Sequence, residues 1–286
     1  MEILTQFTNS YFLWRDPMIV GAFTGAICGF LGVYVVLRRI IFVSATLTQI
    51  SSFGVALSFY LESIGLALFS TLIGPFLLSL ILTMIAAGFY ALKRDFSRIS
   101  REGVIAFGFL IASGGVIILG DRIAIGAHDI STILFGSAVV VDPVDIYLIP
   151  GVVILAFVIH LIYYKDFIFV SFDTEAAKLF KYPVRRLNTL LLITVALVVA
   201  VSTRALGALP VFALLALPPL ASLYLTENLK LVFLFSTIIG TLSATLGYFF
   251  SFVLSIPTGA SIAVCASVFF ILALLWQGIN YKKSWI

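Results

Sequence analysis

Long runs without charged residues recur along the whole chain, and they predict membrane-spanning helices. A helix that crosses the roughly 30 Å hydrocarbon core needs about 20 mainly apolar residues, because every backbone amide must be hydrogen-bonded within its own segment. The run from Leu231 to Tyr281 contains no Asp, Glu, Lys, Arg or His. Pro257, Thr258 and Gly259 interrupt it. They predict a turn that joins two helices.

Charge-free segments of this kind predict an all-α bundle of eight or nine spans, which forms one membrane domain over residues 1–286. The candidate spans are Pro17–Leu37, Thr46–Leu61, Leu66–Leu92, Gly103–Leu119, Val144–Tyr164, Leu187–Thr203, Leu206–Leu225, Leu231–Ser255 and Gly259–Ile279. The second is the shortest and is rich in Ser and Thr. It is therefore the segment expected to be broken or re-entrant if the number of full spans is eight.

Composition supports a protein that lives in lipid. Hydrophobic residues make up 62% of the 286 residues and charged residues 10%, and the mean hydropathy is +1.20. Soluble domains carry about 25% charge. The two cysteines, Cys28 and Cys265, both lie inside apolar runs and indicate neither a disulfide framework nor a metal-binding pair.

The basic residues indicate which way the chain is inserted. Of 17 Lys and Arg residues, only Arg15, Arg122 and Arg204 fall outside if Arg38 and Arg39 are inside. The positive-inside rule then predicts an external N-terminal segment, residues 1–16, and a cytoplasmic C-terminus. The excess of 17 basic over 13 acidic residues is explained by this asymmetry, so it does not indicate a nucleic-acid partner.

The chain shows no chemical machinery of its own. Every Asp and Glu lies at the end of a span or in a loop, whereas a proton- or sodium-coupled carrier is expected to keep a carboxylate near mid-membrane. The only histidines are His128, in an outer loop, and His160, near the inner end of the fifth span. No nucleophile, metal triad or phosphate loop is present. Energy for transport is therefore expected to come from a separate ATPase.

The longest inner loop, about Lys165 to Arg186, contains a short helical stretch. The pattern predicts a helix over Thr174–Phe180, with Asp173 as its N-cap and Pro183 as its end. The loop is either a solvated connector or a docking element for a cytoplasmic partner.

Several sequence motifs follow one another along the chain: Gly29–Arg39, Gly54–Leu57, Arg101–Ala106, Leu134–Ser137 with Asp145, Phe172–Arg186, Ala205–Pro219 and Ser251–Gly259. In this order they resemble the permease subunits of the ABC-3 family, the ATP-driven importers of zinc, manganese and iron. Together they cover nearly the whole chain. The strongest is the inner loop, which is similar to the segment that couples the family's permeases to their ATPase.

The resemblance implies a fold similar to that of type II ABC importer permeases, in a bacterial inner membrane. It implies a second permease copy, identical or not, an ATPase subunit that uses the ATP, and an extracytoplasmic metal-binding protein. This chain would bind no cofactor, would not be an enzyme, and would carry a divalent metal ion inward. The residues that the resemblance assigns to ATPase coupling are Asp173, Glu175, Ala176, Ala177, Pro183, Arg185 and Arg186.

The second span departs from the family pattern. There the family has an Asp followed four residues later by a His, a pair that lies on one helix face and suits zinc or manganese. This chain has Ala45 and Gln49 at those positions. Thr46, Ser51 and Ser52 keep the segment polar, so these three residues and Gln49 are expected to line the substrate pathway.

Three interpretations of this departure are open. The metal is held by a weaker or water-mediated site, or another subunit supplies the ligands, or the cargo is a chelated metal or small organic molecule. An ATP-independent secondary carrier is a further alternative. Three other groups are candidate cation ligands. The outer acidic group consists of Asp121, His128, Asp129, Asp142 and Asp145. The other two candidates are the imidazole of His160, which is expected to be buried, and the carboxylates of Glu62 and Glu102 at span ends. A solvated loop is the favoured interpretation for the outer group.

Overall fold

The computed structural model describes residues 11–65, 74–92, 100–123 and 143–283, and in these ranges the regular structure is helical. The helices are α2 (Tyr11–Leu37), α3 (Ile41–Ser63), α4 (Gly74–Ala91), α5 (Arg101–Arg122), α7 (Pro143–Ile162), α8 (Tyr164–Phe172), α9 (Thr174–Leu179), α10 (Val184–Leu206), α11 (Ala208–Leu225), α12 (Leu229–Leu254) and α13 (Thr258–Lys283).

Within the described ranges, nine helices are long and apolar enough to cross a membrane. The suspicion that the second span is broken is wrong, because α3 is one continuous helix of 23 residues. It begins five positions before the predicted start, since Ile41, Phe42 and Val43 extend its apolar part. The break predicted near Pro257 is confirmed, but it lies slightly earlier than expected: α12 ends at Leu254, and Thr258 and Gly259 already belong to the first turn of α13.

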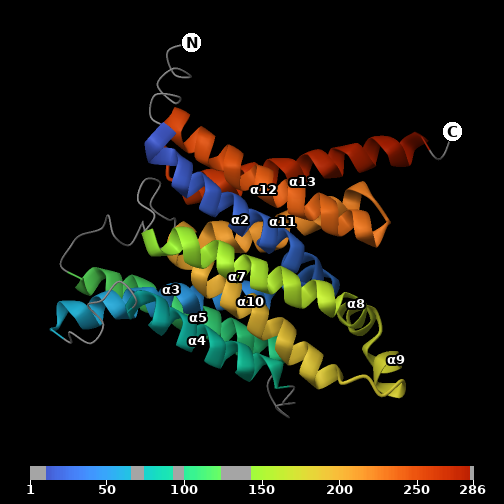
Figure 1. Cartoon of the computed structure of the whole chain (residues 1–286), viewed down its shortest axis with the longest axis horizontal. Coiled ribbons are helices and arrows are strands. Elements are labelled where there is room, and N and C mark those ends of the chain that lie inside the picture. The colour runs from blue at the N-terminus through green and yellow to red at the C-terminus, as the bar shows by residue number, and fades with distance from the viewer. Residues whose placement is uncertain (1–10, 66–73, 93–99, 124–142, 284–286) are drawn as a thin grey trace.

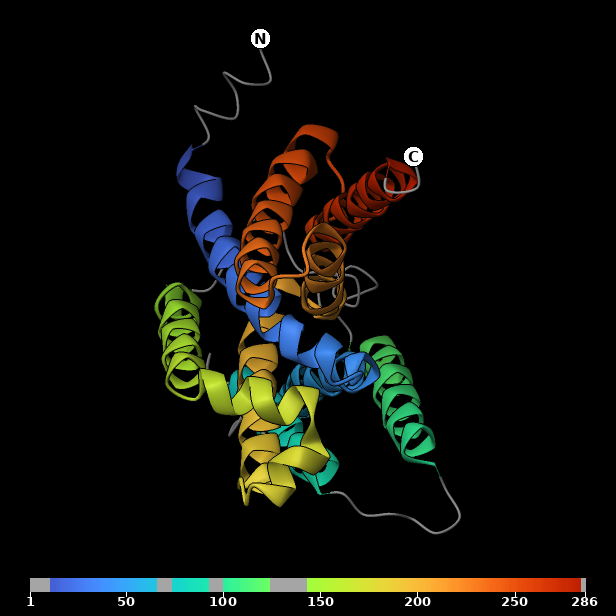
Figure 2. The same cartoon turned by 90° about the vertical axis from the view of Figure 1, so that its right-hand side faces the viewer.

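Two groups of helices make up the bundle (Figure 1). Helices α2, α11, α12 and α13 pack together, and α3, α4, α5 and α10 form a second group. Contacts of α3 and α10 with α11, and of the same two helices with α2, join the groups, while α7 packs on α2 and α10. The short helices α8 and α9 lie beside the last turn of α2 and the first turn of α10 (Figures 1 and 2); this part of the molecule is called the α9 end below.

Backbone contact between α2 and α12 holds the first group together. A Cβ atom built on Gly25 would overlap the carbonyl oxygen of Gly240, and one built on Gly29 would overlap that of Ser236. The Ser236 hydroxyl donates a hydrogen bond to the Gly29 carbonyl at 2.6 Å. Small residues spaced four apart allow two helices to approach this closely in lipid, where dispersion and interhelical hydrogen bonds replace the hydrophobic effect.

The second group uses the same device at α3. A Cβ atom on Gly54 would overlap the backbone of Ser79 in α4. Nearby, the hydroxyl groups of Ser51 and Ser79 share a hydrogen bond of 2.8 Å between the two helices. The polar residues of α3 therefore also contribute to helix packing.

The inner loop differs in part from its prediction. The Asp173 cap is confirmed, because its carboxylate accepts a hydrogen bond from the backbone N–H of Ala176 at 2.8 Å. Pro183 does not end α9. That helix stops at Leu179, Lys181 takes a left-handed conformation (φ 60°), and Pro183 precedes the first turn of α10. Helix α8 was not predicted.

We predict that Gly25→Ala lowers the stability of the purified protein in detergent, because the added methyl group forces α2 and α12 apart. Overpacking of this kind costs typically about 1–3 kcal/mol. The measurement is the melting temperature by size-exclusion chromatography after heating. Gly151→Ala in α7 is the matched control, since a Cβ there meets no atom within 4 Å; equal melting temperatures for the two variants would contradict the prediction.

Candidate translocation site and coupling segment

Helix α3 carries a buried polar stripe. Thr46, Ser51 and Ser52 are buried and Gln49 is half-buried. The Thr46 hydroxyl lies 3.0 Å from the carbonyl of Phe42 and 3.2 Å from that of Ile105 in α5. Ser51 is paired with Ser79. Thr46 and Ser51 are thus engaged in helix packing.

Two other atoms of this stripe lack a hydrogen-bond partner in the protein. They are Oε1 of Gln49 and Oγ of Ser52, both enclosed. A buried polar atom without a partner costs roughly 1–3 kcal/mol, so such atoms in a native structure call for an explanation. Among the predicted pathway residues, Gln49 and Ser52 are the ones with a polar atom that forms no hydrogen bond within the described part of the chain.

The structure brings no set of strong metal ligands to this stripe. Ala45 is 4% exposed, and its methyl group offers no ligand atom. Gln49, one helical turn later, offers a neutral amide oxygen, which suits hard cations better than zinc. In the parts of the chain that the structure describes, no three His, Cys, Asp or Glu residues are close enough to hold a metal ion together.

His160 is packed among aromatic rings. Its Nδ1 donates a hydrogen bond to the carbonyl of Ala156 at 2.9 Å, and its ring stacks on Phe167 with centroids 4.7 Å apart and an interplanar angle of 16°. Nε2 faces the hydroxyl of Thr194 at 3.4 Å. These contacts fit a structural residue that ties α7 to α8 and α10.

The outer acidic group is only partly visible. His128, Asp129 and Asp142 lie outside the described residues. Asp145 is buried and faces Arg204, with Oδ2 at 3.5 Å from Nε, so this pair joins the start of α7 to the end of α10. The remaining candidates are exposed at helix ends, namely Asp121, Glu62 and Glu102.

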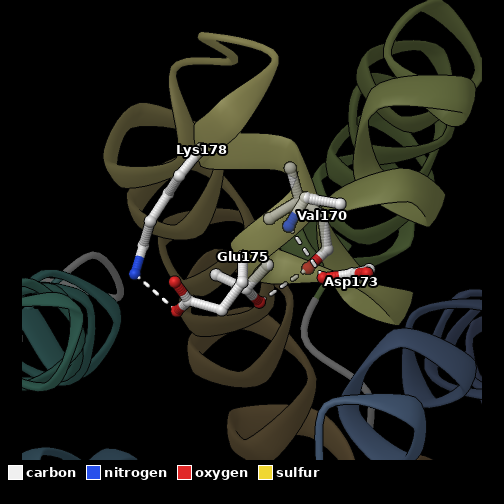
Figure 3. A network of polar contacts seen from close by, with 6 residues as sticks. Val170, Asp173, Glu175 and Lys178 are labelled. Carbon is white, nitrogen blue, oxygen red and sulfur yellow. Dashed lines mark hydrogen bonds and ion pairs between the residues drawn. The ribbon is translucent and has the colours of Figure 1, made fainter.

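The predicted coupling segment, taken as residues 173–186 and called the coupling segment below, begins with the capped helix α9 (Figure 3). Besides the Asp173 cap, the Thr174 hydroxyl donates to the carbonyl of Val170 at 3.1 Å, and Lys178 pairs with Glu175 at 2.7 Å. Glu175 is exposed and Ala176 half-buried, whereas Ala177 is fully buried in this chain. The buried side chain of Ala177 therefore lies on the face of α9 that packs against the rest of the chain.

Sequence reasoning missed the apolar residues at the tip of this segment. Leu179, the last residue of α9, is 84% exposed, and Phe180, which follows it, is 72% exposed. The available signal was an apolar pair among charged residues in a polar loop. Exposed large apolar side chains that lie together indicate an interaction surface.

Arg38 was also missed. At the end of α2 its Nε donates to the Ser171 hydroxyl of α8 at 2.8 Å, and its guanidinium also donates to the Asn188 side chain of α10 and to the Phe167 carbonyl. One side chain thus connects α2, α8 and α10. The partners lie more than a hundred residues away in sequence, so no local pattern could reveal them.

Arg185 and Arg186 lie in the first turn of α10, which begins at Val184, and both are exposed. They do not lie at the tip with Leu179. Instead they line a cavity behind it, together with Lys178 and Tyr182.

The fold and site define a polytopic helical membrane protein with a polar internal helix and a capped short helix, α9, whose last residue Leu179 is exposed. The matching family model is that of the ABC 3 transport family, which covers residues 10–277, and the chain belongs to this family. It is accordingly a membrane transport subunit and not an enzyme.

Relatives match over nearly the whole chain. The manganese transport system membrane protein MntC of Halalkalibacterium halodurans is 27% identical, over 94% of this chain and 88% of its own. The chelated iron transport system membrane protein YfeD of Yersinia pestis is also 27% identical, over 96% and 89%. The solved structure of PsaBC from Streptococcus pneumoniae shares the fold, with a TM-score of 0.80 at 23% identity, over 94% of this chain and 95% of that one.

We predict that Ala45→Asp combined with Gln49→His makes this chain retain divalent metal. The pair would place a carboxylate and an imidazole on one face of α3, and metal bound to the purified protein, measured by mass spectrometry of the elements, should rise by roughly tenfold or more. The same two residue types at Leu57 and Leu61, also four apart on α3, are the matched control. Equal metal content in the two variants would contradict the placement of the pathway.

Proposed function

We propose that this chain is the permease subunit of an ATP-binding-cassette importer, in which a separate ATPase drives a divalent metal ion inward. Membership of the ABC 3 transport family supports this, as do the manganese and chelated-iron relatives. The observation that carries the proposal is the exposed apolar tip of the coupling segment, Leu179 and Phe180, on a chain whose described spans contain no metal-binding cluster.

The tip is the surface that the ATPase would cover. Burying a Leu or Phe side chain contributes about 1.5–3 kcal/mol each, which favours a partner over water. Glu175 lies beside it and is exposed, so a charged contact at the rim is available. The cap at Asp173 and the buried anchor Ala177 keep the short helix rigid while it is pushed.

Movement of the tip has a direct route into the bundle. Helix α9 packs on α8 and α10. Arg38 holds α8 and α10 to the end of α2 through hydrogen bonds to Ser171 and Asn188. A displacement of α9 would thus act on both helix groups at once, and alternate opening of a path beside α3 is the transport step that we propose.

The orientation and the assembly are part of the proposal. We place the α9 end in the cytoplasm of a bacterium, with the N-terminal segment 1–16 outside and residues 1–286 as one membrane domain. A second permease copy, identical or related, would complete the path, and an extracytoplasmic binding protein would deliver the cargo. Arg185, Arg186 and Pro183 belong to the coupling segment in this arrangement.

A second candidate cargo is a chelated metal. The observation that favours it is the neutral pair Ala45 and Gln49, which cannot compete with water or a chelator for a bare transition metal. An amide oxygen and the hydroxyl of Ser52 are suited to hydrogen bonds with a chelate or a hydrated ion. Metal and chelate uptake compared in one assay separates the two cargoes.

We predict that Leu179→Glu with Phe180→Glu abolishes capture of the ATPase, because two charges replace the apolar contact. The measurement is co-purification of the ATPase with the tagged full-length permease. Lys230→Glu, an exposed charge change at the start of α12, should leave capture unchanged. Full capture by the double variant would show that the ATPase docks elsewhere.

The energy source is tested in liposomes. Uptake of manganese, zinc, iron or a chelate should require the permease, the ATPase and ATP together. Uptake by the permease alone under a proton or sodium gradient would establish a secondary carrier and end the proposal. With Cys28 and Cys265 replaced by alanine, the cysteine of a Lys181→Cys variant should react with membrane-impermeant thiol reagents added from the ATPase side only.

A further inference from the structure

Two adjoining cavities open at the α9 end. One of about 190 Å³ lies between α2, α8 and α10, and one of about 710 Å³ lies between α4, the α9 loop and α10. Ala91 and Asn188 line both, so the two spaces share a wall.

The residues that line these cavities carry five positive charges and no negative charge. Arg38 and Arg39 line the smaller cavity, and Lys178, Arg185 and Arg186 line the larger one. Lys178 has a counter-ion, Glu175, at 2.7 Å. Within the described part of the chain, Arg185 and Arg186 form no ion pair.

The surroundings of Arg38 independently indicate that an anion binds in the smaller cavity. Arg38 is a part-buried cation whose hydrogen-bond partners are a hydroxyl, an amide and a carbonyl, with no carboxylate among them. Burial lowers the pKa of its guanidinium to about 10, which leaves it protonated at neutral pH. A buried charge without a counter-ion is costly, and an anion in the neighbouring cavity would offset that cost.

We propose that these cavities bind the phosphate group of an anionic membrane phospholipid. Paired arginine side chains suit phosphate oxygens because their guanidinium groups donate two parallel hydrogen bonds. Basic pockets at the ends of membrane helices are typical sites for such head groups. The site differs from the polar stripe of α3 and is independent of the cargo.

The surface of α4 explains why the ligand is a lipid and not a soluble anion. A stripe of exposed apolar side chains runs along this helix and ends at Leu92, which lines the larger cavity. Its members are Leu77, Ile81, Ile85, Phe89 and Leu92. Spaced four, four, four and three apart, they share one helix face. An acyl chain on this face would lead directly to a head group beside Arg185 and Arg186.

The test measures lipid retained by the purified full-length chain, using native mass spectrometry after washing in detergent with equal phosphatidylglycerol and phosphatidylcholine. The wild-type chain should retain mainly phosphatidylglycerol. Arg185→Gln with Arg186→Gln should reduce that retention by roughly tenfold or more, given the contribution of each juxtamembrane cation. Lys165→Gln with Lys230→Gln, two exposed lysines outside both cavities, should retain lipid as the wild type does.

Several results would overturn the proposal. One is equal retention of the two lipids, and another is unchanged retention in the Arg185 and Arg186 variant with a wild-type melting temperature. If inorganic phosphate, but not phosphatidylglycerol, stabilises the delipidated chain in an arginine-dependent manner, the site takes a soluble anion. If the variant loses ATPase capture and keeps its lipid, the two arginines contact the ATPase instead.

Discussion

The close approach of α2 and α12 is the constraint on which the rest of the structure depends. In lipid, apolar side chains gain little from leaving one apolar surface for another, so helices must be held by shape and by hydrogen bonds. Gly25, Gly29 and Gly240 remove the side chains that would keep the two backbones apart, and Ser236 adds a hydrogen bond in the same place. Because Arg38 directly follows the last residue of α2, this contact also fixes the position from which Arg38 holds α8 and α10.

The distribution of charge then divides the molecule into a neutral middle and two charged ends. At one end Asp145 and Arg204 join α7 to α10. At the other end Arg38, which follows α2, donates hydrogen bonds to uncharged acceptors on α8 and α10. The polar stripe of α3 offers hydroxyl groups and the Gln49 amide, and neither kind of group carries a charge at neutral pH. In the function proposed above, the force comes from a separate ATPase, and the capped helix α9 is the element that would receive it.

Sequence predicted the spans well because the signal for a membrane helix is the absence of charge, which is a local property. The Asp173 cap was also predictable, because a helix cap depends on residues that are close together in sequence. Prediction failed where a feature depends on the next element: α3 extends to Ile41, α8 forms from a run that contains Tyr164 and Phe172, and Pro183 starts α10 instead of ending α9. Other features depend on tertiary structure, so no local sequence pattern could predict them. They are the contact of Arg38 with Asn188, the exposure of Leu179 and the partners of the α3 hydroxyls.

The neutral pair on α3 changes how selectivity must work. A carboxylate with an imidazole selects by replacing the water around a transition metal with stronger ligands. Ala45 and Gln49 cannot do this. A methyl group has no donor atom, and one amide oxygen cannot replace the several water molecules that coordinate a metal ion. A cargo that passes α3 must therefore keep its own shell, whether water or chelator, or receive ligands from a second subunit. Under the function proposed above, the choice of cargo would then be made at least partly outside α3, by a delivering protein or a partner permease, and the polar stripe would serve passage more than recognition.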